Sequence, residues 1–220
     1  MPKIGTPPAH THAGAGVGGQ LDWDQVWSDA AHSHESAAEG SVLHRYQRIL
    51  RTGNYIAPWP YQSIGTVALI ANRLRAHPFL VPRPITLDRL AVEVTGGGGA
   101  GTVLRLGVYA DGVNIYPGAL VRDVGTVAVN AAAVVAATIT GGLSLTSGLY
   151  WLAYLGDGTP TVRQANLTIS PFGLQTASLS TADDVWSAVL TYGALPDPYP
   201  SGAGSTAGAA CVVPRLLTLD

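Results

Sequence analysis

The sequence predicts an all-β protein, an antiparallel β-sandwich of the jelly-roll type that follows an extended, partly helical N-terminal stem. Gly and Pro number 27 and 15 among 220 residues, so turns are frequent. Charged residues make up only 12% of the chain, which leaves little material for long solvated helices. From about Gly53, short apolar or alternating runs are separated by Gly, Pro, Asp and Asn without helical periodicity between them. These runs are too numerous for a small barrel and favour a sandwich.

We expect residues 1–42 to form the stem and residues 43–220 to form the head. Residues 1–20 are dense in Gly, Pro, His and Ala and lack apolar periodicity. Trp23, Val26 and Trp27 then fall on one side of a predicted helix that Asp22 can cap. Because a helix of about three turns is marginal alone in water, we expect these three apolar residues to pack against the same helix of neighbouring chains.

The head is predicted from a succession of β runs. Residues 43–50, which precede these runs, fit a helix or a strand equally well. Two runs alternate with smaller or charged neighbours, which predicts one dry face on each strand. They contain Leu90, Val92 and Val94, and Leu104, Leu106 and Val108. The glycine-rich stretch 96–101 is expected to be a hairpin loop, because it lacks the Lys-Ser/Thr of a phosphate-binding loop. The predicted strands are 63–70, 79–81, 85–94, 102–110, 119–129, 134–140, 148–155, 161–169, 185–192 and 211–219.

Composition argues against several classes of partner. The formal net charge is −2 with no block of like charges, so we expect neither nucleic-acid binding nor a polybasic membrane anchor. No apolar segment of about 20 residues is present, so we expect no membrane insertion. The first residues lack the apolar core of a signal peptide, which predicts synthesis in a cytoplasm. The lone Cys211 cannot form an intrachain disulfide and is expected to be a small buried hydrophobe.

The N-terminal part of the chain contains the motifs His10-x-His12-x-Gly14, Gly18-Gly19-Gln20-Leu21-Asp22, Trp27-Ser28-Asp29, His32-x-His34 and Ala37-Ala38-Glu39-Gly40. These motifs resemble the N-terminal region of the tail-fibre and receptor-binding proteins of tailed bacteriophages. Later stretches, such as "LRLGVYADGVNIYPGALV" and "SGLYWLAYLGD", are similar to the β-sandwich at the distal end of such proteins. The resemblance implies a homotrimeric component of the virion, made in the host, with a stem that attaches to other tail or baseplate proteins. It also implies a head that meets the bacterial surface.

The histidine pairs His10/His12 and His32/His34 are candidate metal ligands. In an extended chain, residues i and i+2 point to the same side, so three chains could surround a transition-metal ion on a threefold axis. The resemblance implies that such an ion, iron or zinc, is structural, because no coordination position stays open for a substrate. Alternatively, these histidines are solvated loop residues in tight interchain packing, and the second pair lies at a helix end where imidazolium is favourable.

The sequence offers candidate ligand-binding residues but no catalytic ones. Most Asp residues lie in Gly-flanked turns, where turn chemistry explains them. Asp183 and Asp184 are adjacent, so on a strand they would not converge on one bond. Aromatic rings offer a flat apolar face to sugars, although each of those in loops could instead be an anchor stacked on Pro. The loop aromatics are Trp59, Tyr61, Tyr116 and Tyr199.

These observations predict a homotrimeric phage tail fibre or receptor-binding protein that attaches to a bacterial surface glycan or protein. Weak sites repeated over several chains would gain effective concentration, so no single site needs high affinity. One alternative is a purely structural adaptor, baseplate or decoration protein that contacts only other virion proteins. A glycan depolymerase is a third alternative, and we expect no enzyme activity.

Overall fold

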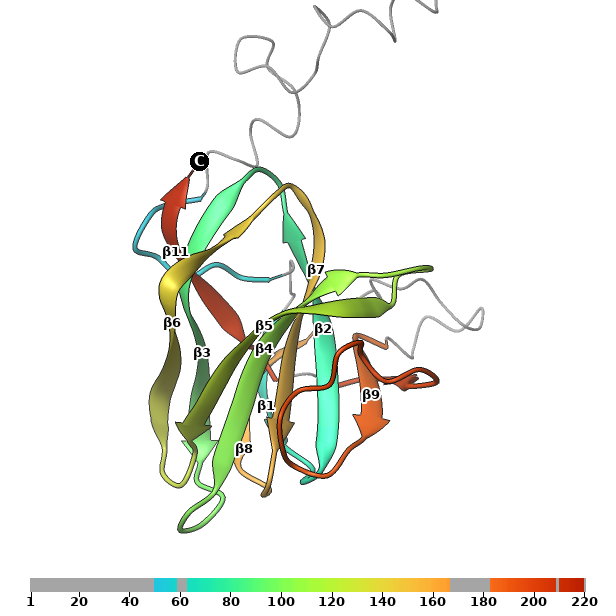
Figure 1. The fold of residues 1–220 in the computed structure, drawn as a ribbon. Coiled ribbons are helices and arrows are strands. Elements are labelled where there is room, and N and C mark those ends of the chain that lie inside the picture. Colours follow the sequence, from blue (N-terminus) through green and yellow to red (C-terminus); the bar gives the residue numbers. More distant parts are fainter. Residues whose placement is uncertain (1–49, 59–62, 167–182, 209, 220) are drawn as a thin grey trace, which may run out of the picture. The chain divides into compact units, whose positions relative to one another are not determined.

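The protein is described by a computed structural model that covers residues 50–58, 63–166, 183–208 and 210–219 (Figure 1). All of these belong to the unit Tyr46–Asp220, which is separate from the unit Met1–Arg45. The predicted stem, and with it the boundary after residue 42, lies outside the described residues. Within the described part of the chain, no helix is long and apolar enough to span a bilayer.

The first of two antiparallel sheets is built around β3. Arg89 of this strand pairs with Arg215 of β11 on one side and with Thr138 of β6 on the other. Val94, farther along β3, pairs with Val162 of β8 on the same side as β11. Strands β11 and β8 therefore follow one another along the same edge, and β6 occupies the opposite edge. The members are β1 (Ser63–Ala68), β8 (Thr161–Asn166), β3 (Ile85–Gly96), β11 (Val213–Leu219) and β6 (Ala133–Leu145).

The second sheet contains six strands in the order β10-β9-β2-β7-β4-β5. Strands β1 to β8 make four nested antiparallel pairs, β1–β8, β2–β7, β3–β6 and β4–β5, which is a long hairpin rolled up into two sheets. This is the strand order of a jelly roll, so the predicted fold class is confirmed. The members are β10 (Gly204–Thr206), β9 (Val185–Val189), β2 (Arg73–Val81), β7 (Gly148–Gly156), β4 (Val103–Asp111) and β5 (Pro117–Ala128).

The main core lies between the sheets. Leu90 and Val92 of β3 and Leu104 and Leu106 of β4 are each 0% exposed and belong to one apolar cluster. The alternation that predicted a dry face on these two strands is therefore confirmed. At about 25 cal/mol per Å² of apolar surface, burial of such side chains is the main stabilising contribution to the sandwich.

A second core covers the outer face of the second sheet. Residues 190–203, here called the strap, run from β9 to β10 and bury Leu195 and Tyr199 against this face. Tyr109 of β4 and Trp151 of β7 lie beneath, and both are 0% exposed. Strand β4 therefore has a second dry stretch, which corrects the expectation of one dry face per strand.

Two strand predictions need correction. Strand β2 begins at Arg73 and not at residue 79. The prediction missed its first half because Arg75 and His77 are polar, although the structure buries both. Pro78 is tolerated because the pairing of β2 with β9 ends at Ala76, so β2 is an edge at this point. Strand β10 has only three residues and was not predicted.

The glycine-rich stretch is also not a hairpin loop, because it connects β3 in the first sheet with β4 in the second. The backbone of this connection lies close to the chain after β5. A Cβ atom on Gly97 would lie 2.1 Å from the carbonyl oxygen of Asn130, and the amide of Gly98 donates to the carbonyl oxygen of Val129 at 3.0 Å. Glycine is needed here because the two backbones touch.

We therefore expect Gly97→Ala to lower the free energy of unfolding by about 2 kcal/mol, since the new methyl group overlaps backbone atoms. Urea unfolding followed by tryptophan fluorescence measures the loss. Gly204→Ala is the matched control, because its Cβ atom would meet nothing within 4 Å. Equal stability of the two variants would contradict the assignment of Gly97 to a close backbone contact.

Candidate functional site

Most of the predicted site residues lie outside the described residues, so their roles stay predictions. This applies to both histidine pairs, to the proposed interchain helix and to one aromatic loop. Among the residues that the structure does describe, no group of three or more His, Cys, Asp or Glu side chains is arranged to hold a metal ion. The residues outside the description are His10, His12, His32, His34, Trp23, Val26, Trp27, Trp59 and Tyr61.

The two remaining candidates, Tyr116 and Tyr199, come together with Trp186 in a group that we call the aromatic corner. Tyr116 follows the turn between β4 and β5, Trp186 lies on β9, and Tyr199 lies in the strap. The ring centroids of Tyr116 and Trp186 are 4.9 Å apart, and those of Tyr116 and Tyr199 are 5.9 Å apart. Three segments distant in sequence therefore meet at one place on the second sheet.

Tyr199 is an anchor of this corner and not a surface for a ligand. It is only 3% exposed, and its hydroxyl lies within hydrogen-bonding distance of the carbonyl oxygens of Leu74 and Trp186, at 3.2 and 3.0 Å. Burial raises the pKa of this phenol. Burial favours the alternative interpretation of Tyr199 as a loop anchor, because a buried ring offers little surface to a ligand.

Tyr116 and Trp186 are half-buried, and their polar atoms connect the hairpin to the strap. The hydroxyl of Tyr116 donates to the carbonyl oxygen of Pro200 and accepts from the amide of Ala203. The indole nitrogen of Trp186 donates to the carbonyl oxygen of Ile115 at 3.0 Å. The rings are thus held in place by bonds at their edges, and their partial exposure leaves part of each ring accessible.

The tip of the β4–β5 hairpin carries exposed apolar side chains next to the aromatic corner. Val113 is 89% exposed and Ile115 is 43% exposed. Asn114 and Ile115 have φ values of 62° and 54°, in the left-handed region, which is unfavourable for a β-branched residue. Such strain persists only where surrounding contacts impose it, and it is concentrated at functional sites. The hairpin extends away from the body of the second sheet in Figure 1.

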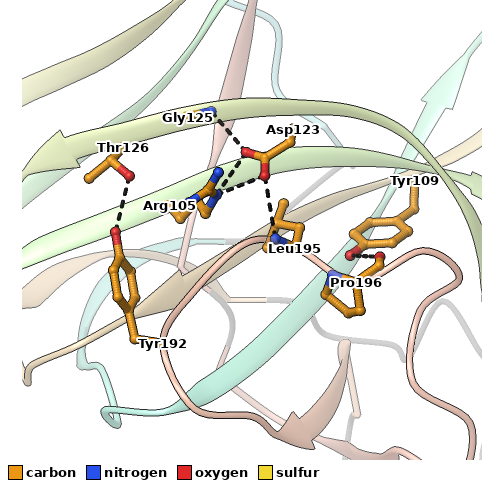
Figure 2. Close-up of polar contacts among 8 residues, drawn as sticks. All are labelled: Arg105, Tyr109, Asp123, Gly125, Thr126, Tyr192, Leu195 and Pro196. Carbon is orange, nitrogen blue, oxygen red and sulfur yellow. Dashed lines mark hydrogen bonds and ion pairs between the residues drawn. The ribbon is translucent and has the colours of Figure 1, made fainter.

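Asp123 fixes the strap that supports the corner (Figure 2). Its carboxylate accepts from Nε of Arg105 at 2.8 and 2.9 Å and from the amides of Gly125 at 3.1 Å and Leu195 at 3.3 Å. A further bond joins the hydroxyls of Thr126 and Tyr192 at 3.0 Å, as Figure 2 shows. One carboxylate therefore connects β4, β5 and the strap.

Sequence reasoning missed this role, because it attributed Asp123 to turn chemistry. No local signal marks a carboxylate whose partners lie 18 and 72 positions away. Other carboxylates also bond to the chain itself. Asp157 accepts from the amide of Val103 at 2.8 Å, Asp111 accepts from the indole of Trp151 at 2.9 Å, and Asp183 accepts from the hydroxyl of Ser205 at 2.7 Å.

Comparisons with protein-family models, with curated proteins and with solved structures found no match. The function of the chain has therefore to be argued from its fold and from the geometry of the aromatic corner.

Proposed function

We propose that this chain is a homotrimeric component of a phage tail, a tail fibre or receptor-binding protein, whose head attaches the virion to a bacterial surface glycan. Jelly rolls are common in viral and sugar-binding domains, which supports a virion protein with a binding head. The motifs of residues 1–42 support a stem that joins sister chains and other tail or baseplate proteins. The observation that carries the proposal is the strained, apolar hairpin tip beside the aromatic corner.

The chemistry of this region suits a sugar. Partly exposed Tyr116 and Trp186 offer ring faces to the apolar side of a pyranose, while the polar side chain of Asn114 is exposed for hydroxyl groups. Val113 and Ile115 add apolar contact at the rim. Each site would be weak, and repetition over three chains and several fibres would supply the avidity.

The test uses Ile115→Asn and Val113→Asp in the full chain. Asn tolerates the left-handed region, so Ile115→Asn is expected to fold at least as stably as the original protein. Both variants are expected to reduce binding to intact bacterial cells and to purified surface polysaccharides roughly tenfold. The assay measures retention of fluorescently labelled protein on cells and on a polysaccharide array. Val134→Asp is the control, since Val134 is 68% exposed on β6 of the other sheet.

The outcomes separate the candidate functions. Unchanged binding in the tip variants would show that the receptor site lies elsewhere on the protein. A protein that binds tail proteins but no cells would be a structural adaptor. Release of oligosaccharides from the polysaccharides would indicate a depolymerase. A monomer in sedimentation at micromolar concentration would overturn the homotrimer and the threefold metal site.

A further inference from the structure

A row of four residues crosses the outer face of the first sheet. Tyr55 forms a bridge with Arg215 of β11, Arg215 pairs with Arg89 of β3, and Arg89 pairs with Thr138 of β6. Residues directly opposite one another in antiparallel strands point to the same face. The four side chains therefore lie side by side, across four consecutive segments of the sheet.

This row faces solvent. The neighbours of the two arginines along their strands, Leu90 and Leu216, are 0% exposed and belong to the core between the sheets. Because side chains alternate along a strand, Arg89 and Arg215 point away from that core. Their side chains are 32% and 28% exposed, and Tyr55 is 43% exposed.

A bulge in β3 places one carboxylate beside the two arginines of the row. The register with β11 and with β6 shifts between Leu87 and Arg89, which brings Asp88 to the same side as the arginines. Nε of Arg215 donates to the carboxylate of Asp88 at 2.9 Å, and Nε of Arg89 lies 3.4 Å from it. Two guanidinium groups thus share one carboxylate, which leaves a formal charge of +1 among these three groups.

That arrangement is unfavourable without a further anion. Like charges directly opposite in a sheet destabilise it. Among the residues that the structure describes, the two arginines share the single carboxylate of Asp88, which compensates only one of them. The ion pair between Arg163 and Glu93 on the same sheet is balanced, with Nε and Oε1 3.0 Å apart. Bulges are also enriched beside functional sites, where they redirect a side chain.

We propose that Arg89, Arg215 and Tyr55 form a binding site for an acidic sugar, in which the arginines bind the carboxylate and the Tyr55 ring packs against the sugar. The planar guanidinium fork matches a carboxylate, and an exposed phenol ring offers an apolar face to a pyranose. The hydroxyl of Thr138, at the end of the row, is placed for a ring hydroxyl. This site is on the opposite sheet from the aromatic corner and does not depend on it.

The test is a calorimetric titration of the full chain with trigalacturonate, with its fully methylated ester as the uncharged probe that keeps the same sugar rings. The acid is expected to bind and the ester to bind at least roughly tenfold more weakly. Arg89→Gln leaves the pair of Asp88 and Arg215 in place and is expected to weaken binding of the acid to a similar extent. Tyr55→Ala should weaken it as well, whereas Tyr55→Phe should not.

Arg163→Gln is the control, because it removes a charge from the same sheet but outside the row, and it should bind like the original protein. Equal binding of acid and ester, or an unchanged Arg89→Gln variant, would overturn the proposal. Tighter binding of inorganic phosphate than of trigalacturonate would also overturn the sugar assignment. The tip variants should keep full binding of trigalacturonate, so failure of the proposed receptor site and failure of this site give different results.

Discussion

Replacement of Asp123 by Ala is expected to lower the free energy of unfolding by about 3 kcal/mol and to detach the strap from the second sheet. The carboxylate accepts from one guanidinium and two backbone amides, and the side chains of Arg105 and Asp123 are only 26% and 22% exposed. Its removal leaves Arg105 and the amide of Leu195 without their acceptor in a partly desolvated place. Loss of an acceptor there costs more than the bond itself contributed.

Urea unfolding and hydrogen exchange of the amides in residues 190–203 check this expectation. Glu93→Ala provides the comparison, because the pair of Arg163 and Glu93 has a similar length but side chains that are 42% and 45% exposed. An exposed pair contributes less than about 1 kcal/mol. If both variants lose the same stability, or if strap amides in Asp123→Ala stay as protected as before, Asp123 does not hold the strap.

The protein is expected to lose about 3 kcal/mol of stability as the pH falls from 6.5 to 4, through His77. This residue is 5% exposed on β2, and burial lowers its pKa from the ordinary 6.5 to about 4, although the carbonyl of Pro78 acts in the opposite direction. The unfolded chain therefore binds a proton in this range that the folded chain does not. Stability is complete above pH 6.5 and declines as the pH falls towards 4.

Urea unfolding at several pH values between 7 and 4, on the original protein and on His77→Leu, measures this contribution. Nε2 of His77 has no hydrogen-bond partner within the described structure, so an apolar replacement gives up only the long contact of Nδ1 with the carbonyl oxygen of Pro78, at 3.4 Å. The variant should be the more stable protein near pH 4.5. The pKa of Asp88 is lowered from 3.8 by its bond with Arg215, so this carboxyl titrates below the range in question. Parallel pH dependence in both proteins would exclude His77 as the cause.

One residue of the aromatic corner could be selected from the sequence alone. Tyr116 was selected as a candidate because a loop aromatic between turn residues is exposed to solvent more often than one in a strand, and its contact with a ligand stays a prediction. The same argument misplaced Tyr199, because the strap folds back and buries it under contacts with Leu74 and Trp186. Trp186 was not among the candidates, because its contact with Tyr116 depends on how β9 pairs with β2. Distances along the chain carry no information on that pairing.

Alternation of apolar residues and the Gly, Pro, Asp and Asn between runs determined by themselves that the head is an antiparallel sandwich, because these signals are local and recur along the chain. The tertiary structure alone decided that Arg75 and His77 belong to a strand, that residues 190–203 cover a sheet, and that Arg89 meets Arg215. Each of these depends on a partner far away in the chain. Burial of a polar group is a property of the surroundings that packing creates, and no pattern within a short stretch of sequence records it.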